Sequence, residues 1–207
     1  MSDTPASTRD HWSHVYQTKG EDEVSWLQGT PTESLRMIRD ARLRPGAPVL
    51  DVGGGASRLV DALLLDGYRV GVLDVAPEAL AAARVRLGAR ASAVEWFAAD
   101  VLAFESPHPW DLWHDRAVFH FLTDPADRAR YRDVLLASLA PGGHVVMAPF
   151  GPGGPERCSG LPVQRYDAGA LAAALGSELR LVESYSAVHS TPTGTGQEFL
   201  FARFVRV

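Results

Sequence analysis

The chain has 207 residues, of which 46% are hydrophobic and 22% charged, as is typical of a globular protein with one sizeable core. No apolar run approaches about 18 residues, which excludes a transmembrane helix, and the polar first nine residues lack the apolar region of a secretory signal. The formal charge of −5 argues against a general nucleic-acid or anionic-membrane binder. We therefore expect a cytoplasmic protein.

The N-terminal part predicts little regular structure. A loose tail is expected at 1–9 and a short helix at 11–17, and residues 1–30 are predicted to be a lid or tail segment. A helix is predicted at 31–43, with Thr32 as its cap. We expect residues 31–207 to form one domain.

From residue 48 short apolar runs alternate with amphipathic stretches. Strands are predicted at 48–52, 68–74, 93–98, 110–115 and 144–148, and helices at 57–65, 77–87, 127–139 and 167–175. Pro141, Gly142 and Gly143 are expected to end the third of these helices. Two longer strands, 179–189 and 198–207, have no helix between them and predict an antiparallel hairpin. The predicted fold class is α/β, a doubly wound sheet of seven mostly parallel strands.

A glycine-rich loop follows the first predicted strand, in the sequence Asp51-Val52-Gly53-Gly54-Gly55-Ala56-Ser57. Glycines let a ligand approach the backbone, and the next helix offers free N–H groups at its N-terminus. In open α/β sheets ligands bind at the carboxyl ends of the strands. The loop therefore predicts a ligand site, although a glycine turn with solvated acids remains the alternative.

Three carboxylates lie at the ends of three consecutive predicted strands. Asp51 would repel a phosphate but suits an ammonium or sulfonium group, which disfavours a dinucleotide site. Asp74 is placed to accept hydrogen bonds from ribose hydroxyls, and Asp100 from an adenine amino group. Together they predict a ligand with a cationic amino-acid part, a ribose and an adenine.

These features resemble the class I S-adenosylmethionine-dependent methyltransferases, through VLDVGGGAS (49–57), VLDVAPEAL (72–80) and AADVL (98–102). The resemblance implies a Rossmann-like fold and S-adenosyl-L-methionine as cofactor, with S-adenosyl-L-homocysteine as product. Ser57 departs from it, because many members have a third glycine there. The implied cofactor-binding residues are Tyr16, Trp26, Asp51, Gly53, Gly54, Gly55, Asp74, Val75, Asp100, Val101 and Asp115.

The chain is also similar to a narrower group of small bacterial methyltransferases. The shared segments are HWxxVYxTK and VSWxQ near the N-terminus, HDRAVFHFL (114–122) and CSGLPVxRY (158–166). The substrates of this group are mostly unassigned, so this similarity indicates the fold and cofactor more than the acceptor.

Candidate catalytic residues follow the fourth predicted strand. Asp115 is placed to orient the acceptor or the donor ammonium, or else to cap a turn or pair with Arg116. His120, on a predicted helical turn, is either a general base or a histidine packed between two phenylalanines. Cys158 lies in a Gly/Pro-rich loop, as a contact to the acceptor or as a small buried side chain. A soft-metal site of Cys158, His120 and His189 is a lesser possibility, and no metal is expected.

The aromatic residues Trp12, Tyr16 and Trp26 are predicted either to pack the N-terminal segment onto the domain or to form a lid over the donor. The Asn/Asp-Pro-Pro-aromatic motif of nucleic-acid and many amide methyltransferases is absent. We therefore expect a small-molecule acceptor with an N, O or S nucleophile, no nucleic-acid or membrane partner, and a monomer or homodimer. A protein (lysine) methyltransferase and a non-catalytic S-adenosylmethionine-binding protein remain alternatives.

Overall fold

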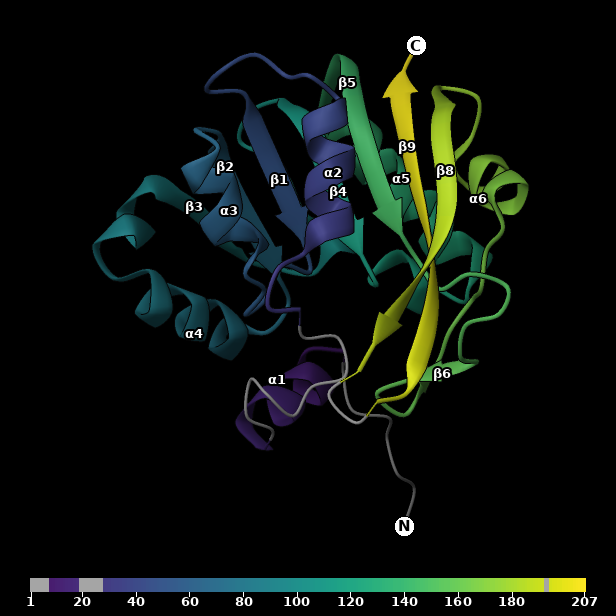
Figure 1. The fold of residues 1–207 in the computed structure, drawn as a ribbon, viewed down its shortest axis with the longest axis horizontal. Helices are drawn as coiled ribbons and strands as arrows, with labels where there is room; N and C mark the ends of the chain where they lie inside the picture. The colour runs from purple at the N-terminus through teal and green to yellow at the C-terminus, as the bar shows by residue number, and fades with distance from the viewer. Residues whose placement is uncertain (1–7, 19–27, 192–193) are drawn as a thin grey trace.

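The computed structural model describes residues 8–18, 28–191 and 194–207, and its centre is a twisted sheet with helices on both faces (Figure 1). Among these residues, no helix is both long and apolar enough to cross a membrane. The shorter runs of apolar residues instead form the strands and helix faces of one α/β fold.

The seven-stranded sheet has the order β3-β2-β1-β4-β5-β9-β8 and confirms the predicted fold class. Its strands are β1 (Pro48–Val52), β2 (Arg69–Asp74), β3 (Val94–Ala98), β4 (Trp110–Arg116), β5 (Leu139–Ala148), β8 (Leu179–Ser190) and β9 (Gly196–Arg206). The first five pair in parallel, whereas β9 runs antiparallel to both β5 and β8. The parallel strands therefore end at one edge of the sheet, where their connecting loops meet.

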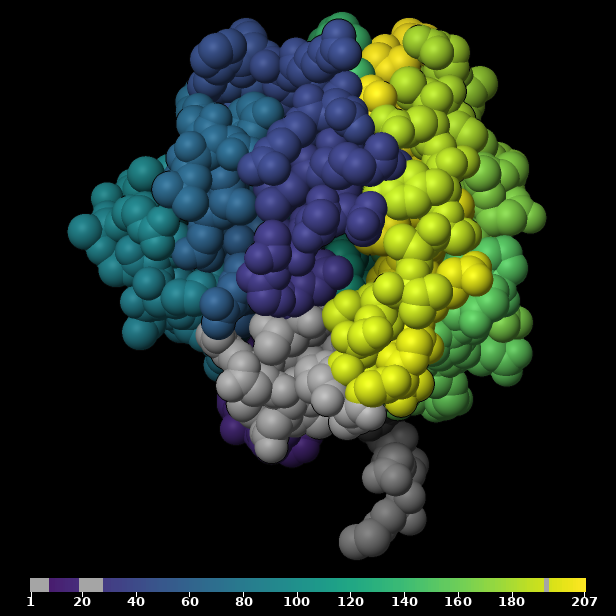
Figure 2. Space-filling model, viewed as in Figure 1, coloured from purple at the N-terminus to yellow at the C-terminus, as the bar shows by residue number. Residues whose placement is uncertain are grey.

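Helices cover the two faces of the sheet in separate groups. In Figure 1, α2 (Thr32–Asp40) and α3 (Leu59–Leu65) lie in front of the sheet and α5 (Pro125–Ser138) lies behind it. Side chains of α2, α3 and α4 (Pro77–Leu87) share one hydrophobic cluster, whereas α5 and α6 (Ala168–Leu175) contribute to the other. Figure 2 shows α2 covering the front of the molecule beside β8.

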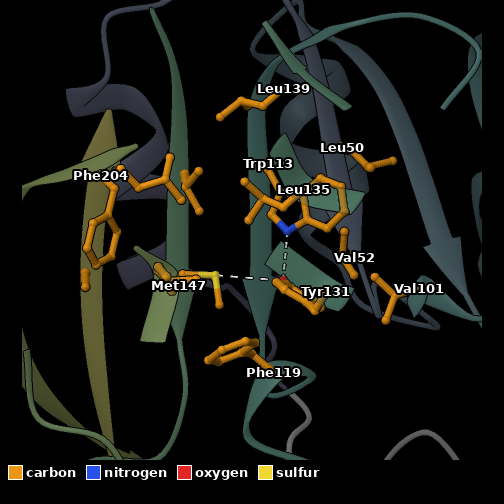
Figure 3. Close-up of a cluster of buried hydrophobic side chains, with 14 of the residues drawn as sticks. Leu50, Val52, Val101, Trp113, Phe119, Tyr131, Leu135, Leu139, Met147 and Phe204 are labelled. Carbon is orange, nitrogen blue, oxygen red and sulfur yellow. Dashed lines mark hydrogen bonds between the residues drawn. The ribbon is translucent and has the colours of Figure 1, made fainter. Parts of the chain in front are cut away.

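The core behind the sheet is built around aromatic side chains and includes buried polar contacts. Trp113, Phe119 and Tyr131 are fully buried there (Figure 3). The indole N–H of Trp113 donates to the Tyr131 hydroxyl at 2.8 Å, which satisfies the buried nitrogen. Because β4 carries both Trp113 and the residues that follow it, this core supports the end of the strand that enters the site.

The predicted helices and strands are confirmed with shifts at their ends. The helix predicted at 11–17 is α1 (Thr8–Thr18). The prediction of Thr32 as a cap is wrong: Pro31 occupies the N-cap position, and no side chain makes a capping hydrogen bond there. By contrast, the Ser57 hydroxyl accepts a hydrogen bond from the Leu59 N–H at 3.1 Å, at the start of α3.

The segment Pro141-Gly142-Gly143 does not lie between a helix and a strand as predicted. β5 already begins at Leu139, which pairs with Trp110, and regular pairing resumes at His144 after a register shift. Gly142 has a φ of 72°, a left-handed conformation that glycine adopts without strain. The three residues therefore form an irregularity within β5. The following Gly/Pro-rich loop contains a small hairpin of β6 (Arg157–Cys158) and β7 (Leu161–Pro162).

Candidate active site

A cavity of about 260 Å³ lies at the carboxyl ends of the parallel strands. One part of its wall comes from the loops after β1, β2 and β3, and another from α1, the loop after β4 and the β6–β7 hairpin. The lining residues are Thr8, Trp12, Tyr16, Val52, Gly53, Leu73, Asp74, Val75, Ala99, Asp100, Val101, Leu102, Arg116, Ala117, Val118, Phe121, Leu122, Asp127, Cys158 and Leu161. The cavity therefore joins the predicted donor and acceptor regions.

The glycine loop passes close to its neighbours at each glycine. Gly53 has a φ of 64°, and a Cβ built there would lie 2.1 Å from Cγ2 of Val118. A Cβ on Gly54 would lie 2.6 Å from Oδ2 of Asp51, and one on Gly55 would lie 2.6 Å from the hydroxyl of Tyr16. Larger residues at these positions would therefore displace the loop itself, the carboxylate of Asp51 or helix α1.

Asp51 lies below this loop and forms a buried chain of hydrogen bonds. Its Oδ1 is 2.7 Å from Nδ1 of His114, whose Nε2 is 2.9 Å from the hydroxyl of Ser34. All three side chains are buried. An ionised carboxylate can only accept, so the Nδ1–H of His114 donates to Asp51. Sequence reasoning assigned no role to His114 or Ser34, because the partners lie on β1, β4 and α2.

The acids at the ends of β2 and β3, Asp74 and Asp100, both line the cavity. Burial raises the pKa of Asp74 to about 7, partly offset by the N–H of Ala76, which donates to Oδ1 at 2.8 Å. Asp100 is exposed, and its Oδ1 accepts from the N–H of Leu102 at 2.9 Å. Val75 and Val101, the residue after each acid, also line the wall.

Helix α1 closes one side of the cavity with its aromatic side chains. Trp12 meets the ring of Phe121 edge-on, with centroids 5.1 Å apart, and Tyr16 lies over Gly55. On its other side, Ser13 and Gln17 donate to the carboxylate of Glu78 on α4. The predicted donor contact Trp26 lies outside the described residues.

Asp115 is buried behind the wall, and its carboxylate organises the turn that follows β4. The hydroxyl of Tyr131 donates to Oδ2 at 2.5 Å, and the N–H groups of Val118 and Phe119 donate to the carboxylate at 2.9 and 3.1 Å. Burial raises the pKa of Asp115, while these donors oppose the shift. The turn includes Ala117 at a φ of 68°, a strained value for a residue with a side chain. Asp115 itself is absent from the lining set.

His120 is fully buried on the short 3₁₀ helix η4 (Phe119–Phe121). Its ring contacts those of Phe121 and Phe150, and its Nδ1 accepts from the N–H of Phe150 at 3.4 Å. Burial, followed by the charge of Arg116, lowers the pKa of His120 to about 3. The imidazole is therefore neutral at physiological pH and lies behind the cavity wall.

Cys158 lines the cavity and lies in the β6–β7 hairpin, where it pairs with Leu161. Its side chain is buried within a hydrophobic cluster that includes Phe150 and Phe199. The possible soft-metal site is not formed: among the described residues, no three His, Cys, Asp or Glu side chains gather in a metal-binding arrangement.

Arg116, the last residue of β4, lines the cavity and was not among the predicted site residues. Its guanidinium lies over the ring of Phe199, 4.6 Å from the centroid. A cationic residue directly after a predicted buried strand is the signal that could have indicated it. The direction of the side chain could not be read from the sequence, because the next residues form the turn held by Asp115.

Comparisons with known proteins agree with this fold. Residues 50–145 match the methyltransferase domain family. Nodulation protein S of Rhizobium tropici is 32% identical over 143 residues, which span 67% of this chain and 60% of that protein. Ubiquinone biosynthesis O-methyltransferase of Xylella fastidiosa (strain 9a5c) is 34% identical over 138 residues, 59% of this chain and 53% of that protein. This chain thus aligns with only part of the length of each relative.

Among solved structures, the N-methyltransferase NodS from Bradyrhizobium japonicum WM9, in complex with S-adenosyl-L-homocysteine, superposes with a TM-score of 0.72. The match covers 95% of this chain and 99% of that one at 23% identity. At that identity the likeness concerns the fold. Residues 50–145 thus match a methyltransferase domain, and the fold of the chain is like that of a solved N-methyltransferase.

Proposed function

We propose that the protein is a methyltransferase that uses S-adenosyl-L-methionine and transfers its methyl group to an N, O or S nucleophile of a small molecule. One observation carries the proposal. A single cavity joins a glycine loop and two acids at successive strand ends to an apolar region that contains Trp12 and Phe121.

The residues around the glycine loop fit the donor. Asp74 faces the cavity at the end of β2 and offers an acceptor for ribose hydroxyls, and Asp100 at the end of β3 offers one for the adenine amino group. Asp51 places negative charge below the loop, which favours the ammonium end. A Cβ at Gly53 or Gly55 would collide with Val118 or Tyr16, so the loop needs glycine at these two positions, and Gly53 itself lines the cavity.

The bound donor supplies a methyl group already activated by a sulfonium, so the protein mainly aligns and desolvates the acceptor. Alignment can lower a barrier by about 7–11 kcal/mol. In our proposal residues 31–207 form the catalytic domain, and the segment 1–30 acts as a lid. Contacts of Trp12 and Tyr16 at the wall support that role.

Within this proposal Asp115 and His120 act as positioning residues. Asp115 holds the turn that presents Ala117 and Val118 to the cavity, and His120 supports the same turn from below. Cys158 contributes to the wall near the acceptor.

The size of the cavity favours a small acceptor, as do the relatives named for nodulation and ubiquinone biosynthesis. A lysine side chain is less favoured, because it needs an acidic groove at Asp115. That carboxylate lies behind the wall, and the next residue, Arg116, brings a positive charge to the cavity.

The first test is calorimetric binding of S-adenosyl-L-methionine to the full chain and to Asp74→Asn. The matched control is Asp133→Asn, an exposed acid on α5 outside the cavity. We expect the Asp74 variant to lose about 10- to 100-fold in affinity, which is the usual effect of losing hydrogen bonds to a charged group. Unmeasurable binding to the unaltered protein, or equal binding by all three proteins, would refute the proposed donor site.

The second test follows a labelled methyl group from the donor into cell lysate. The labelled lysate is then separated by a filter with a cut-off of ~3 kDa. Label in the filtrate supports a small-molecule acceptor. Label on protein would instead favour the lysine alternative. Donor binding without any label would favour the non-catalytic alternative and count against the proposed activity.

A further inference from the structure

The second half of the glycine loop is held by an arginine from another element. Arg86 lies in the last turn of α4, and its Nη1 donates to the carbonyl of Ala56 at 2.7 Å. Its Nη2 donates to the carbonyl of Ser57, also at 2.7 Å. A planar guanidinium presents its N–H groups as a fixed fork, which suits two neighbouring acceptors. The helix after β2 therefore holds the loop after β1 through two consecutive carbonyls.

An acid on α3 fixes the orientation of this guanidinium. Nε and Nη2 of Arg86 donate to Oδ2 of Asp61 at 3.2 and 3.0 Å. Asp61 lies in the first turn of α3, the helix that follows the loop. The two side chains are only 18% and 22% exposed, so salt and solvent screen the pair less than they would at the surface. Arg86 thus joins α4, the start of α3 and the end of the loop in one network of hydrogen bonds.

The first half of the loop is anchored differently, by a carbonyl of β2. The N–H groups of Gly53 and Gly54 donate to the carbonyl of Leu73 at 2.7 and 3.3 Å. In the second half, the N–H of Ser57 donates to the carbonyl of Gly54 at 2.8 Å, a bond that shapes the turn but does not join it to another element. The contacts of Arg86 supply such a join. The loop is therefore fixed on one side by β2 and on the other by α4.

A loop with this backbone depends on such restraints. Gly53 and Gly55 have φ values of 64° and 45°, and glycine loses more conformational freedom on folding than any other residue. Gly55 also has close neighbours, because a Cβ on it would lie 2.6 Å from the hydroxyl of Tyr16 and 3.0 Å from Oδ2 of Asp74. Since Ala56 follows Gly55 directly, a displaced Ala56 would also move Gly55 relative to the carboxylate that lines the cavity.

We propose that Arg86 is a positioning residue for the methyl donor, which holds the glycine loop in the conformation that receives S-adenosyl-L-methionine. This inference rests on the proposed function. Neither Arg86 nor the two residues it holds are among the described residues that line the cavity, whereas Gly53 is. Arg86 therefore acts through the loop backbone. A loop that is ordered before binding loses less entropy when the donor binds, so this restraint raises donor affinity.

The test compares the binding of S-adenosyl-L-homocysteine to the full chain and to three variants by calorimetry. Arg86→Gln removes the charge and the fork, whereas Arg86→Lys keeps the charge beside Asp61 but not the planar fork. The matched control is Arg39→Gln, which breaks two hydrogen bonds to Asp66, of 2.8 and 3.0 Å, at the other end of α3. Urea unfolding measures the stability of each protein, and hydrogen exchange compares residues 53–59 with β4.

We expect Arg86→Gln to bind S-adenosyl-L-homocysteine about 10-fold more weakly, as for the loss of hydrogen bonds from a charged group. Its amide exchange should rise at 53–59 while β4 remains protected, a pattern that a general loss of stability would not produce. Arg86→Lys should lose less affinity, about threefold, with the same local pattern, and it carries the test if Arg86→Gln does not fold. Arg39→Gln should bind as the unaltered protein does.

Equal donor affinity of Arg86→Gln and the unaltered protein would overturn the proposal. So would an equal loss of affinity in Arg39→Gln, or exchange that rises evenly over the whole chain, because a general loss of stability would then explain the weaker binding. Failure of S-adenosyl-L-homocysteine to bind the unaltered protein would instead refute the proposed function.

Discussion

The chain Ser34–His114–Asp51 allows a sharp prediction, because each bond can be removed separately. His114→Gln places an amide near the position of Nε2 and leaves Oδ1 of Asp51 without the imidazole donor 2.7 Å away. His114→Asn places its amide near Nδ1, so the bond to Asp51 is kept and the bond to Ser34, at 2.9 Å, is lost.

The size of the effect follows from the burial of the carboxylate. Asp51 is buried, and its Oδ2 has no hydrogen-bond partner among the described residues. Leaving a buried acceptor without its donor costs about 1–3 kcal/mol, and more where the acceptor is a carboxylate, whereas loss of one neutral hydrogen bond costs about 1 kcal/mol. We therefore expect His114→Gln to lower the free energy of unfolding by about 3 kcal/mol or more. His114→Asn should lower it by about 1–2 kcal/mol, including a small void.

Urea unfolding measures these changes, and donor calorimetry reports on the loop above Asp51. Donor affinity should fall for the Gln variant well beyond the fall for the Asn variant. Ser34→Ala provides the coupling test: it should cost about 1 kcal/mol in the unaltered protein and almost nothing in the His114→Asn background. Equal stability of the Gln and Asn variants, or an unchanged cost of Ser34→Ala in both backgrounds, would refute the role assigned to His114.

Three further predictions concern the cavity wall and the buried histidine behind it. Gly53→Ala should abolish donor binding and lower the melting temperature, because its Cβ would lie 2.1 Å from Val118 at a positive φ; unchanged calorimetry would contradict this. The pKa of Asp74 is raised to about 7, so the stability that its protonated form contributes is present at low pH and is lost as the pH rises through 7. Donor affinity should instead increase over pH 6–8, because the ionised carboxylate is the better acceptor for ribose hydroxyls. Asp74→Asn should flatten both profiles, and a persisting slope would assign them elsewhere. Because the pKa of His120 is lowered to about 3, its neutral form stabilises the fold above pH 6.5 and that stability is lost on acidification. His120→Gln should therefore leave the pH profile of turnover unshifted, and loss of an activity limb near pH 6–7 would restore the general-base hypothesis.

Local sequence was enough to predict the strands, and the glycine loop and the acids that line one part of the cavity. Buried strands such as Pro48–Val52 are short apolar runs, and the glycine loop and the acids Asp74 and Asp100 follow such runs directly. Parallel strands end at one edge, so residues just after them gather without knowledge of distant contacts. The same locality explains why the irregular start of β5 was missed: Leu139 pairs with Trp110, far back in the chain.

The part of the cavity near the end of β4 depended on contacts between distant elements. The direction of Asp115 is set by Tyr131 and by a turn with Ala117 at a positive φ, and neither feature has a sequence signal at Asp115 itself. Ser34 and His114 are 80 residues apart, and Arg116 reaches a ring on β9. The amino-acid sequence by itself determined the succession of strands and helices along the chain, the glycine loop and the acids near it, because these depend on neighbours along the chain. Only the tertiary structure decided which side chains after β4 face the cavity, because that depends on how separate elements pack against each other.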